Sequence, residues 1–191
     1  NMEKQAMGIF DVFNKISVVP RTDLVWITSV AKQKGAVGYL TKNRPDLCVA
    51  WFEQTQRTFK RHLNEENQVN IEIKLAGSMR LYDLNNKNAV FLEHYPVYSK
   101  EANLLSEYRP AHVCFLNSLD DPIFQLFGGN IASLMRGLGL GEDEYIENDM
   151  VCNAVMKAQK KLEKKFRDDF YARSSEEWME MYRTYHQQRL R

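Results

Sequence analysis

The residues best suited to acid–base chemistry in this sequence are Glu93 and His94, which are adjacent. A carboxylate beside an imidazole can tune the proton affinity of the ring, and histidine is the side chain whose ordinary pKa lies nearest neutrality. The two residues end an apolar run that reads as a β-strand, and successive strand residues point to opposite faces. We therefore interpret them as side chains that do not share a reacting atom, and a small enzyme that uses His94 is the least favoured alternative.

Three further polar residues, Asn117, Asp120 and Asp121, follow the last predicted strand. The two aspartates could bind magnesium, but Pro122 comes next, and an aspartate before proline is typical of the capped start of a helix. In an open parallel sheet, ligands bind at the carboxyl ends of the strands. The candidate ligand site at this edge therefore consists of Glu93, His94, Asn117, Asp120 and Asp121.

No other pattern gives a convincing reaction centre. A phosphate-binding loop needs glycines and a lysine in the order Gly-x-x-x-x-Gly-Lys-Ser/Thr, which does not occur; residues 137–141 have the glycines but lead into acidic residues. His112 and Cys114 share one face of a predicted strand, but two ligands do not make a zinc site. We therefore assign no catalytic, cofactor-binding or metal-ligating residue and expect no cofactor.

The elements that must position these residues alternate between two kinds of apolar pattern. Short apolar runs of strand length alternate with segments of helical period, which predicts an α/β fold with a mainly parallel sheet and crossover helices. Within residues 69–76, Val69, Ile71, Ile73 and Leu75 alternate with other residues and share one face, which is typical of a half-exposed or edge strand. The predicted strands are 23–29, 47–52, 69–76, 89–95 and 111–116, and the predicted helices between them are 31–40, 53–63 and 99–108.

Beyond residue 118 the pattern becomes helical. A helix is predicted over 122–127, a long helix from about Ile146, and a last helix that opens with the capping box Ser174-x-x-Glu177. Apolar residues of the last helix form a stripe along one side. Spacing alone does not show whether this stripe is internal packing or a partner-binding face. Its residues are Trp178, Met181, Tyr182 and Tyr185.

Composition narrows the class of protein. Hydrophobic residues make up 44% and charged residues 27% of the chain, as in globular domains, and the formal net charge of +1 gives no reason to expect a nucleic-acid partner. The three cysteines are widely spaced, which predicts free thiols in a reducing, cytoplasmic environment. The sequence has no run of about 18 consecutive apolar residues, so no membrane span is predicted. The short amphipathic segment 7–13 could pack on the core or make a peripheral contact with a partner or membrane.

Three segments together resemble the end of the second motor domain of SecA, the preprotein translocase ATPase. In SecA a strand ends in a Ser-Leu-Glu-Asp-Asp type turn, a helix runs to a Phe-Gly, and a long helix opens with Pro-Ile-Glu-His-x-Met-Val and carries Ala-Gln-Lys-Lys-Val-Glu. Order and approximate spacing are kept here, although Asn148 and Asp149 replace the histidine. The segments are Phe-Leu-Asn-Ser-Leu-Asp-Asp-Pro-Ile-Phe-Gln-Leu-Phe-Gly-Gly at 115–129, Ile-Glu-Asn-Asp-Met-Val at 146–151 and Ala-Gln-Lys-Lys-Leu-Glu at 158–163.

A weaker likeness covers residues 89–108, which are similar to a SecA strand and its following Ser-Val-Glu-x-Ser-Glu helix. The resemblance implies a RecA-like, P-loop-type α/β layer over residues 1–118 and a helical extension over 119–191 that packs on it or projects from it. SecA also has Gly-Arg-Gly-Thr-Asp-Ile and Gln-x-x-Gly-Arg-x-Gly-Arg-Gln-Gly segments, whose arginines reach the nucleotide. Neither segment occurs in this sequence.

The expected function follows from this combination of likeness and loss. The resemblance implies a non-hydrolysing relative of SecA that acts through contacts with a protein partner, in a role accessory to protein secretion. The alternative is a domain that binds a small ligand or nucleotide at the carboxyl ends of its strands. The sequence identifies neither the partner nor the oligomeric state.

Overall fold

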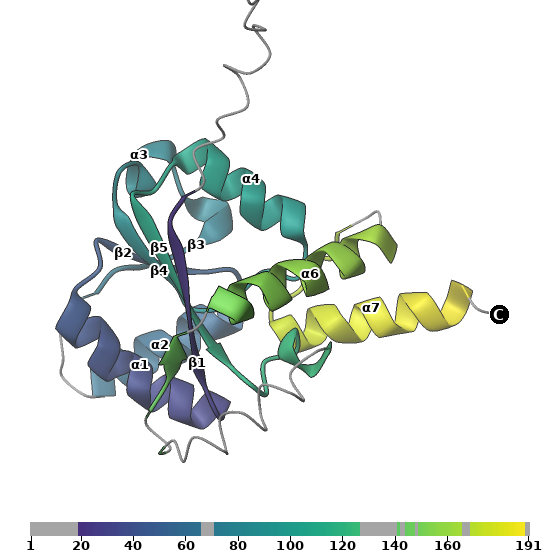
Figure 1. Cartoon of the computed structure of the whole chain (residues 1–191), viewed down its shortest axis with the longest axis horizontal. Coiled ribbons are helices and arrows are strands. Elements are labelled where there is room, and N and C mark those ends of the chain that lie inside the picture. The colour runs from purple at the N-terminus through teal and green to yellow at the C-terminus, as the bar shows by residue number, and fades with distance from the viewer. Residues whose placement is uncertain are drawn as a thin grey trace, which may run out of the picture.

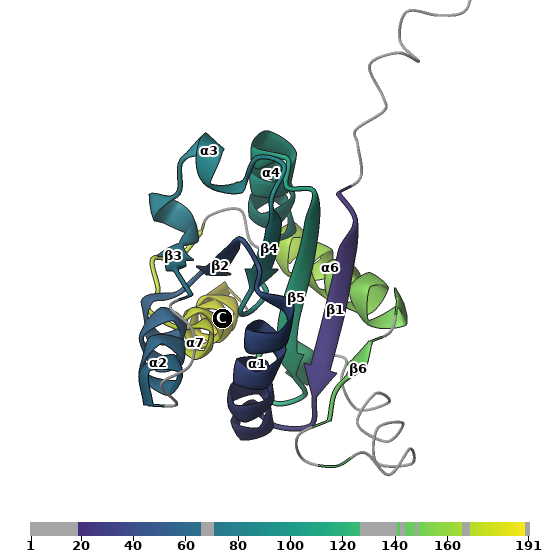
Figure 2. The same cartoon turned by 90° about the vertical axis from the view of Figure 1, so that its left-hand side faces the viewer.

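The computed structural model of the chain describes residues 19–65, 71–126, 141, 144–147, 149–165 and 169–189. Its strands are β1 (Arg21–Trp26), β2 (Leu47–Ala50), β3 (Ile73–Leu75), β4 (Asn88–Phe91), β5 (His112–Ser118) and β6 (Ile146–Glu147). They form one sheet in the order β3-β2-β4-β5-β1-β6, in which β6 alone of the described strands runs antiparallel to its neighbour (Figure 2). This arrangement confirms the predicted α/β class and is consistent with a RecA-like fold.

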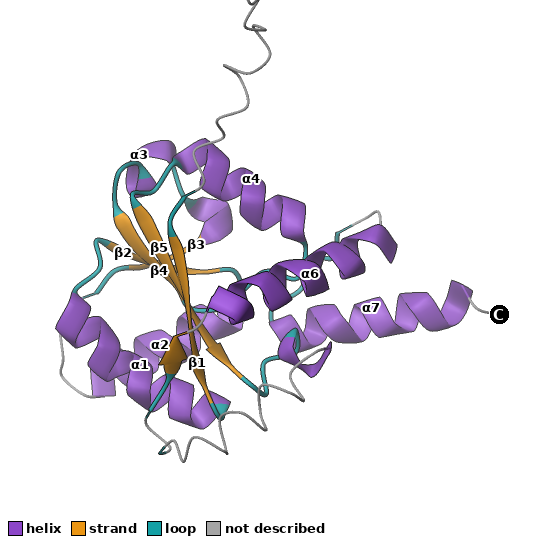
Figure 3. Cartoon of the chain, in the orientation of Figure 1, coloured by secondary structure: helices purple, strands orange, loops and turns teal. Residues whose placement is uncertain are grey.

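Helices cover both faces of the sheet (Figure 3), which explains why the parallel strands are apolar on both sides. None of the described helices combines the length and apolarity that a membrane crossing requires. The helices are α1 (Ser29–Asn43), α2 (Glu53–Glu65), α3 (Leu81–Leu84), α4 (Tyr98–Tyr108), α6 (Asp149–Lys165) and α7 (Ser175–Arg189), with 3₁₀ turns η2 (Ala76–Ser78) and η3 (Phe124–Leu126).

The core therefore has one layer on each side of the sheet. On one face, Leu40 of α1 and Phe59 of α2 pack against strand residues such as Cys48. On the other face, Leu84 of α3 and Leu105 of α4 pack against the remaining strand side chains. This alternation places successive residues of each strand in different layers, and all four residues of β2 are buried.

Local caps determine where the first crossover helix begins and ends. The Thr28 hydroxyl accepts a hydrogen bond from the Ala31 N–H at 3.1 Å, which satisfies a free amide in the first turn of α1. At the other end Arg44 takes a left-handed conformation with φ 43°, and its N–H bonds to the Leu40 carbonyl. The chain thus turns out of α1 immediately before β2.

The structure corrects the prediction of a helix over 122–127. Only a 3₁₀ turn forms, at Phe124–Leu126, and Phe127 lies outside the described residues. The Asp121 carboxylate accepts from the Ser118 N–H at 2.8 Å and from the Ser118 hydroxyl at 2.7 Å. These bonds close a tight turn directly after β5, so Asp121 stabilises a turn and not the start of a helix.

Element boundaries also differ from those predicted. The long helix begins at Asp149 and not near Ile146, because Ile146 and Glu147 pair with β1 as an edge strand. The predicted strand over 89–95 ends at Phe91, and the predicted strand over 69–76 is observed only at 73–75, with residues 66–70 outside the described ranges. The strand expected over 23–29 begins at Arg21 and ends at Trp26.

Helices α6 and α7 pack against each other, and α7 extends beyond the sheet (Figure 1). Leu162 of α6 lies in one apolar cluster with Trp178 and Tyr182 of α7. Because Trp178 is 0% and Tyr182 9% exposed, these two residues of the predicted partner face belong to the core of the structure. Met181 and Tyr185 are half-buried. The division of the chain at residue 118 stays a prediction, since β6 lies beyond it and still joins the sheet.

Candidate functional site

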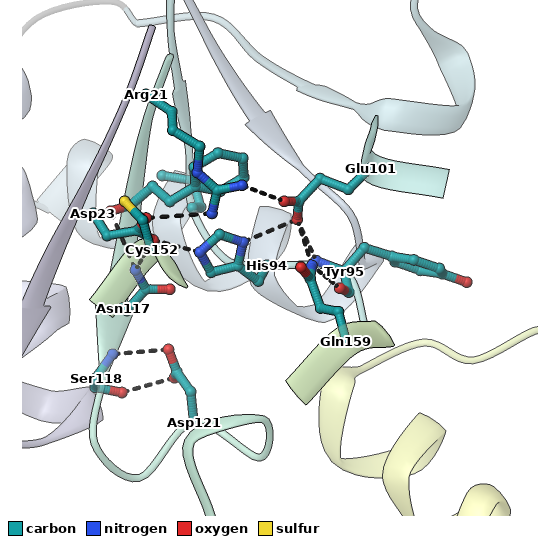
Figure 4. A network of polar contacts seen from close by, with 12 residues as sticks. Arg21, Asp23, His94, Tyr95, Glu101, Asn117, Ser118, Asp121, Cys152 and Gln159 are labelled. Carbon is teal, nitrogen blue, oxygen red and sulfur yellow. Dashed lines mark hydrogen bonds and ion pairs between the residues drawn. The ribbon is translucent and has the colours of Figure 1, made fainter. Parts of the chain in front are cut away.

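A buried ionic network centred on His94 lies between the sheet and helices α4 and α6 (Figure 4). The His94 Nε2 atom lies 2.5 Å from Asp23 Oδ1, and its Nδ1 atom lies 2.9 Å from Glu101 Oε2. Asp23 and Glu101 are each 1% exposed and His94 is 3% exposed. A carboxylate at each ring nitrogen, shielded from water, strongly stabilises the protonated, positively charged form of the imidazole.

The sheet and α4 hold this histidine in place. Asp23 comes from β1 and Glu101 from the first turn of α4, whereas His94 follows the end of β4. The imidazole stacks on the ring of Phe115 in β5, with centroids 4.1 Å apart and planes 14° apart. Strand order brings these parts together, because β4, β5 and β1 are consecutive in the sheet.

Arg21 supplies a second cation to the same two carboxylates. Its guanidinium nitrogens lie 3.3 Å from Asp23 Oδ2 and 3.5 Å from Glu101 Oε1. Burial lowers the pKa of His94, but the charges of Glu101 and Asp23 outweigh burial and raise it to about 9. Burial opposes ionisation of Asp23 as well, but His94 and Arg21 hold its pKa well below the ordinary value. Two cations therefore balance two anions near neutral pH.

Helix α6 and strand β5 complete the network with neutral polar groups. The Gln159 side-chain amide donates to the Tyr95 carbonyl at 2.7 Å and to Glu101 Oε2 at 3.1 Å. The Cys152 thiol and the Asn117 amide donate to Asp23 at 2.5 and 3.0 Å. The oxygens Asn117 Oδ1 and Gln159 Oε1 are buried and have no hydrogen-bond partner among the described residues.

The contacts of the network join β1, β5, α4 and α6 to one another. Both ring nitrogens of His94 are occupied, so neither is available to a substrate. Burial, followed by the charge of Asp23, raises the pKa of the Cys152 thiol to about 12, which leaves no nucleophilic thiolate near neutral pH. Across the described residues, no group of three or more His, Cys, Asp or Glu side chains is placed to hold a metal ion.

A second set of polar groups lies at the carboxyl edge of the sheet. One of them is Asp120, at the start of α1. Asp120 Oδ2 accepts from the Ser29 N–H at 2.9 Å and from the Ser29 hydroxyl at 3.1 Å. Ser29 is the first residue of α1. The carboxylate therefore sits at the positive end of the α1 dipole and bonds to an amide that the helix leaves free.

Glu93 occupies the corresponding position before α2. Its Oε1 atom accepts from the N–H groups of Trp51 and Phe52, both at 3.1 Å, and its Oε2 atom lies 2.5 Å from the Thr55 hydroxyl. Burial raises the pKa of Glu93 to about 7, although the Thr55 hydrogen bond opposes that shift. Its carboxyl group thus fixes the turn that joins β2 to α2.

Lys32 and Asp121 form an ion pair at the same edge. Lys32 Nζ lies 2.9 Å from each carboxylate oxygen of Asp121, and Lys32 is only 5% exposed. Beside this pair is a cavity of about 110 Å³, whose lining includes Lys32, Thr55, Glu93, His94 and Asp121. Three of the predicted site residues, Glu93, His94 and Asp121, meet at this cavity.

The structure separates the predicted site residues into two groups. Glu93 and Asp121 serve the carboxyl edge, Asp120 caps α1, and Asn117 belongs to the buried network. His94 lines the cavity, but both of its ring nitrogens bond to carboxylates of the network. Glu93 and His94 lie beyond the end of β4, so the predicted alternation of strand residues does not apply to them; they have separate hydrogen-bond partners, and both line the cavity. His112 and Cys114 bond to Thr22 and Tyr39 at 3.1 and 3.4 Å.

Several residues of the site were not found from the sequence. Asp23 directly precedes the apolar run 24–27 in a predicted strand, and a carboxylate buried there must be paired, so its position carried a usable signal. Glu101 and Gln159 lie on helices among other polar residues, and only the packing of those helices shows that they are buried. The sequence contains no comparable signal for Arg21 or Lys32.

Comparison with known proteins relates part of this chain to SecA. A segment of 50 residues is 50% identical to the protein translocase subunit SecA of Sulfurimonas denitrificans, and covers 26% of this chain and 6% of that protein. The match to SecA of Oleidesulfovibrio alaskensis is 47% over 55 residues, 28% of this chain and 6% of the relative. A segment of 67 residues is 39% identical to SecA of Psychrobacter, and covers 35% of this chain and 7% of that protein.

The chain thus contains a SecA-related segment, as the sequence motifs predict, and the match is similar in length to the resembling region 115–163. The matched part of the chain spans only 6–7% of the length of these relatives. No protein-family model matches the chain.

Proposed function

Because part of the chain is related to SecA, we propose that the protein is a non-hydrolysing SecA relative that acts through protein contacts in protein translocation. The relatives are named as subunits of the protein translocase. The match covers a small part of those proteins, so the activity of this chain has to be argued from its own residues. The observation that carries the proposal is that carboxylates of the chain itself occupy the carboxyl edge of the sheet.

At that edge, carboxylates of the chain fill the positions that attract anions. Nucleotide-binding α/β proteins hold phosphate groups at helix N-termini, where free N–H groups and the helix dipole favour negative charge. Here Asp120 bonds to the first residue of α1, and Glu93 bonds to the two N–H groups before α2. A phosphate group would have to displace a bound carboxylate at either position.

The buried lysine of the edge is also engaged. Lys32 is bound by both oxygens of Asp121, and Asp121 is in turn held by two hydrogen bonds from Ser118. The sequence lacks the glycine loop and the arginine segments with which SecA handles its nucleotide. These features support a protein that keeps the shape of a motor domain without hydrolysing ATP.

Calorimetric titration of the full chain with magnesium ATP and magnesium ADP tests the nucleotide part of the proposal. We expect no binding heat and no phosphate release above that of buffer. Asp121→Asn is the matched variant, because it weakens the hold on Lys32 without removing the side chain. Weak binding that emerges only in this variant would show that the internal ion pair blocks the edge. Tight nucleotide binding or steady phosphate release by the unaltered chain would overturn the proposal.

Cross-linking in the cells that encode the protein tests the contact part of the proposal. The tagged full chain, purified after brief cross-linking, is expected to enrich components of protein translocation relative to an unrelated tagged protein of equal size. Recovery of the chain alone, or equal recovery of such components with both baits, would contradict the proposed role.

A small-ligand function at the carboxyl edge is the second candidate, because a cavity does lie there. Its volume of about 110 Å³ is below the ~300–1,000 Å³ of usual ligand pockets. The space suits a few water molecules or a small ion better than a nucleotide. A thermal shift with small anions or common metabolites that disappears in Glu93→Gln would favour this candidate.

A further inference from the structure

We propose that the open groove beside α7 binds a basic amphipathic helix of a partner protein, an inference that rests on the proposed action through protein contacts. The groove has a volume of about 530 Å³. Its walls come from α7 and from the residues that precede that helix. The lining residues are Phe170, Glu177, Glu180, Met181, Thr184 and Tyr185.

The spacing of these residues suits a helix. Glu177, Met181 and Tyr185 are four residues apart, and Glu180 and Thr184 lie between them, so all five share one side of α7. The side spans roughly 12 Å, a little more than two helical turns. A second helix fills such a surface by placing its own side chains at three- and four-residue intervals between those of the first.

The floor of the groove is apolar and held in position. Met181 and Tyr185 are half-buried, so each keeps part of its side chain in the groove. The Phe170 ring packs edge-on against Trp178 at 5.5 Å and against Tyr185 at 6.4 Å. Since Trp178 is fixed in the core, the floor needs little rearrangement when a partner docks.

The rim of the groove, formed by Glu177 and Glu180, favours a basic partner. Glu180 is exposed, and Glu177 accepts a hydrogen bond from the Arg173 N–H at 2.6 Å, which fixes its carboxylate at the groove. Of the described residues that line the groove, none is basic. Lysines or arginines beside the apolar stripe of a partner helix would therefore complement the rim, and an acidic helix would be repelled.

A neighbouring hollow, which the ion pair of Lys100 and Asp169 also lines, adds further aromatic surface. This hollow, about 390 Å³ in volume, shares Phe170 with the groove and continues over Trp51, Tyr95 and Tyr171. Tyr171 is 83% exposed, which is unusual for a large aromatic side chain. A partner longer than the groove can therefore continue across Phe170 onto a second aromatic surface.

Fluorescence anisotropy with a designed probe tests this inference on the full chain. The probe is a labelled amphipathic helix of about four turns that contains only leucine and lysine, and the control probe has glutamate at every lysine position. We expect the lysine probe to bind, and Glu180→Lys to weaken binding about tenfold or more. Met181→Ser and Tyr185→Ser should also weaken it, with thermal melting to show that each variant is folded.

Glu176→Lys is the matched control, because Glu176 is an exposed acid of the same helix that does not line the groove. It changes net charge as Glu180→Lys does, and binding should stay within about twofold of the unaltered chain. Equal weakening by both charge variants, equal binding of both probes, or no binding would each overturn the inference. None of these results decides the proposed function, which the nucleotide and cross-linking experiments test without this probe.

Discussion

Gln159 of α6 donates its side-chain amide to Glu101 of α4 across 3.1 Å, which joins the region 115–163, where the SecA resemblance is clearest, to a helix of the α/β layer. The same amide reaches the Tyr95 carbonyl at 2.7 Å, and Gln159 is 0% exposed. A buried donor shared by two acceptors on different elements fixes α6 against the sheet more specifically than apolar packing can.

Replacing Gln159 by leucine should therefore destabilise the fold. The Tyr95 carbonyl and one oxygen of Glu101 would lose a buried donor, at a cost of about 1–3 kcal/mol in the free energy of unfolding. Gln159→Glu should cost more at neutral pH, because it sets a second carboxylate beside Glu101. Urea denaturation measures both variants, with the exposed Lys157→Leu as a control that should shift stability by no more than ~0.5 kcal/mol. Equal effects of Gln159→Leu and the control would show that the bond is not structurally important.

His94 should make stability fall as pH rises towards alkaline values. Its pKa is about 9 in the folded chain against an ordinary 6.5, so the folded protein holds a proton that the unfolded chain releases between those values. The resulting stability is fully present below about pH 6.5 and is lost as pH rises through about 9, by roughly 3 kcal/mol. Urea denaturation at a series of pH values should show this loss in the unaltered chain and not in His94→Gln. Parallel curves for the two proteins would contradict the assignment.

Glu93 should produce a separate loss of stability at lower pH. Its pKa is about 7 in the folded chain against 4.5 ordinarily, so its contribution is fully present below about pH 4.5 and is lost as pH rises through about 7. Glu93→Gln keeps an acceptor for the Trp51 and Phe52 N–H groups but does not ionise. This variant should remove the slope between these pH values while leaving the His94 slope above them. A slope unchanged by the substitution would assign it to another group.

The cysteines should be unreactive in the folded protein. Cys48, Cys114 and Cys152 are all buried, and burial is the first cause that raises the pKa of each thiol to about 12. A disulfide reagent at about pH 8 should therefore modify none of them within minutes, because only the thiolate reacts. After denaturation the same assay should count all three cysteines of the sequence. One rapidly modified thiol in the native chain, lost again in Cys152→Ala, would mean that α6 opens readily.

Sequence patterns predicted the sheet well because its strands are apolar on both faces and are separated by clear helical segments. The predicted helix over 122–127 was wrong because Asp121 can cap a turn as readily as a helix, and the choice depended on hydrogen bonds to Ser118. Strand β6 was missed because two residues, Ile146 and Glu147, carry no periodicity. Its existence depends on β1, a partner far away in the sequence.

The candidate site was predictable only in part. Glu93, Asp120 and Asp121 lie at the carboxyl ends of strands, where topology alone places them, so their general location followed from the pattern. Their partners did not, because Lys32 and the N–H groups of Trp51 and Phe52 meet them only in three dimensions. The balanced charges of Arg21, Asp23, His94 and Glu101 come from β1, the loop after β4 and α4, and no local pattern links these three segments.

Strand β1 lies between β5, whose residues 115–118 fall in the region 115–163 that resembles SecA, and β6, which lies wholly within that region. That region therefore encloses a strand contributed by a distant part of the chain and cannot be cut out as a self-sufficient module. The region 115–163, about a quarter of the chain, thus depends on residues 21–26 for its place in the sheet.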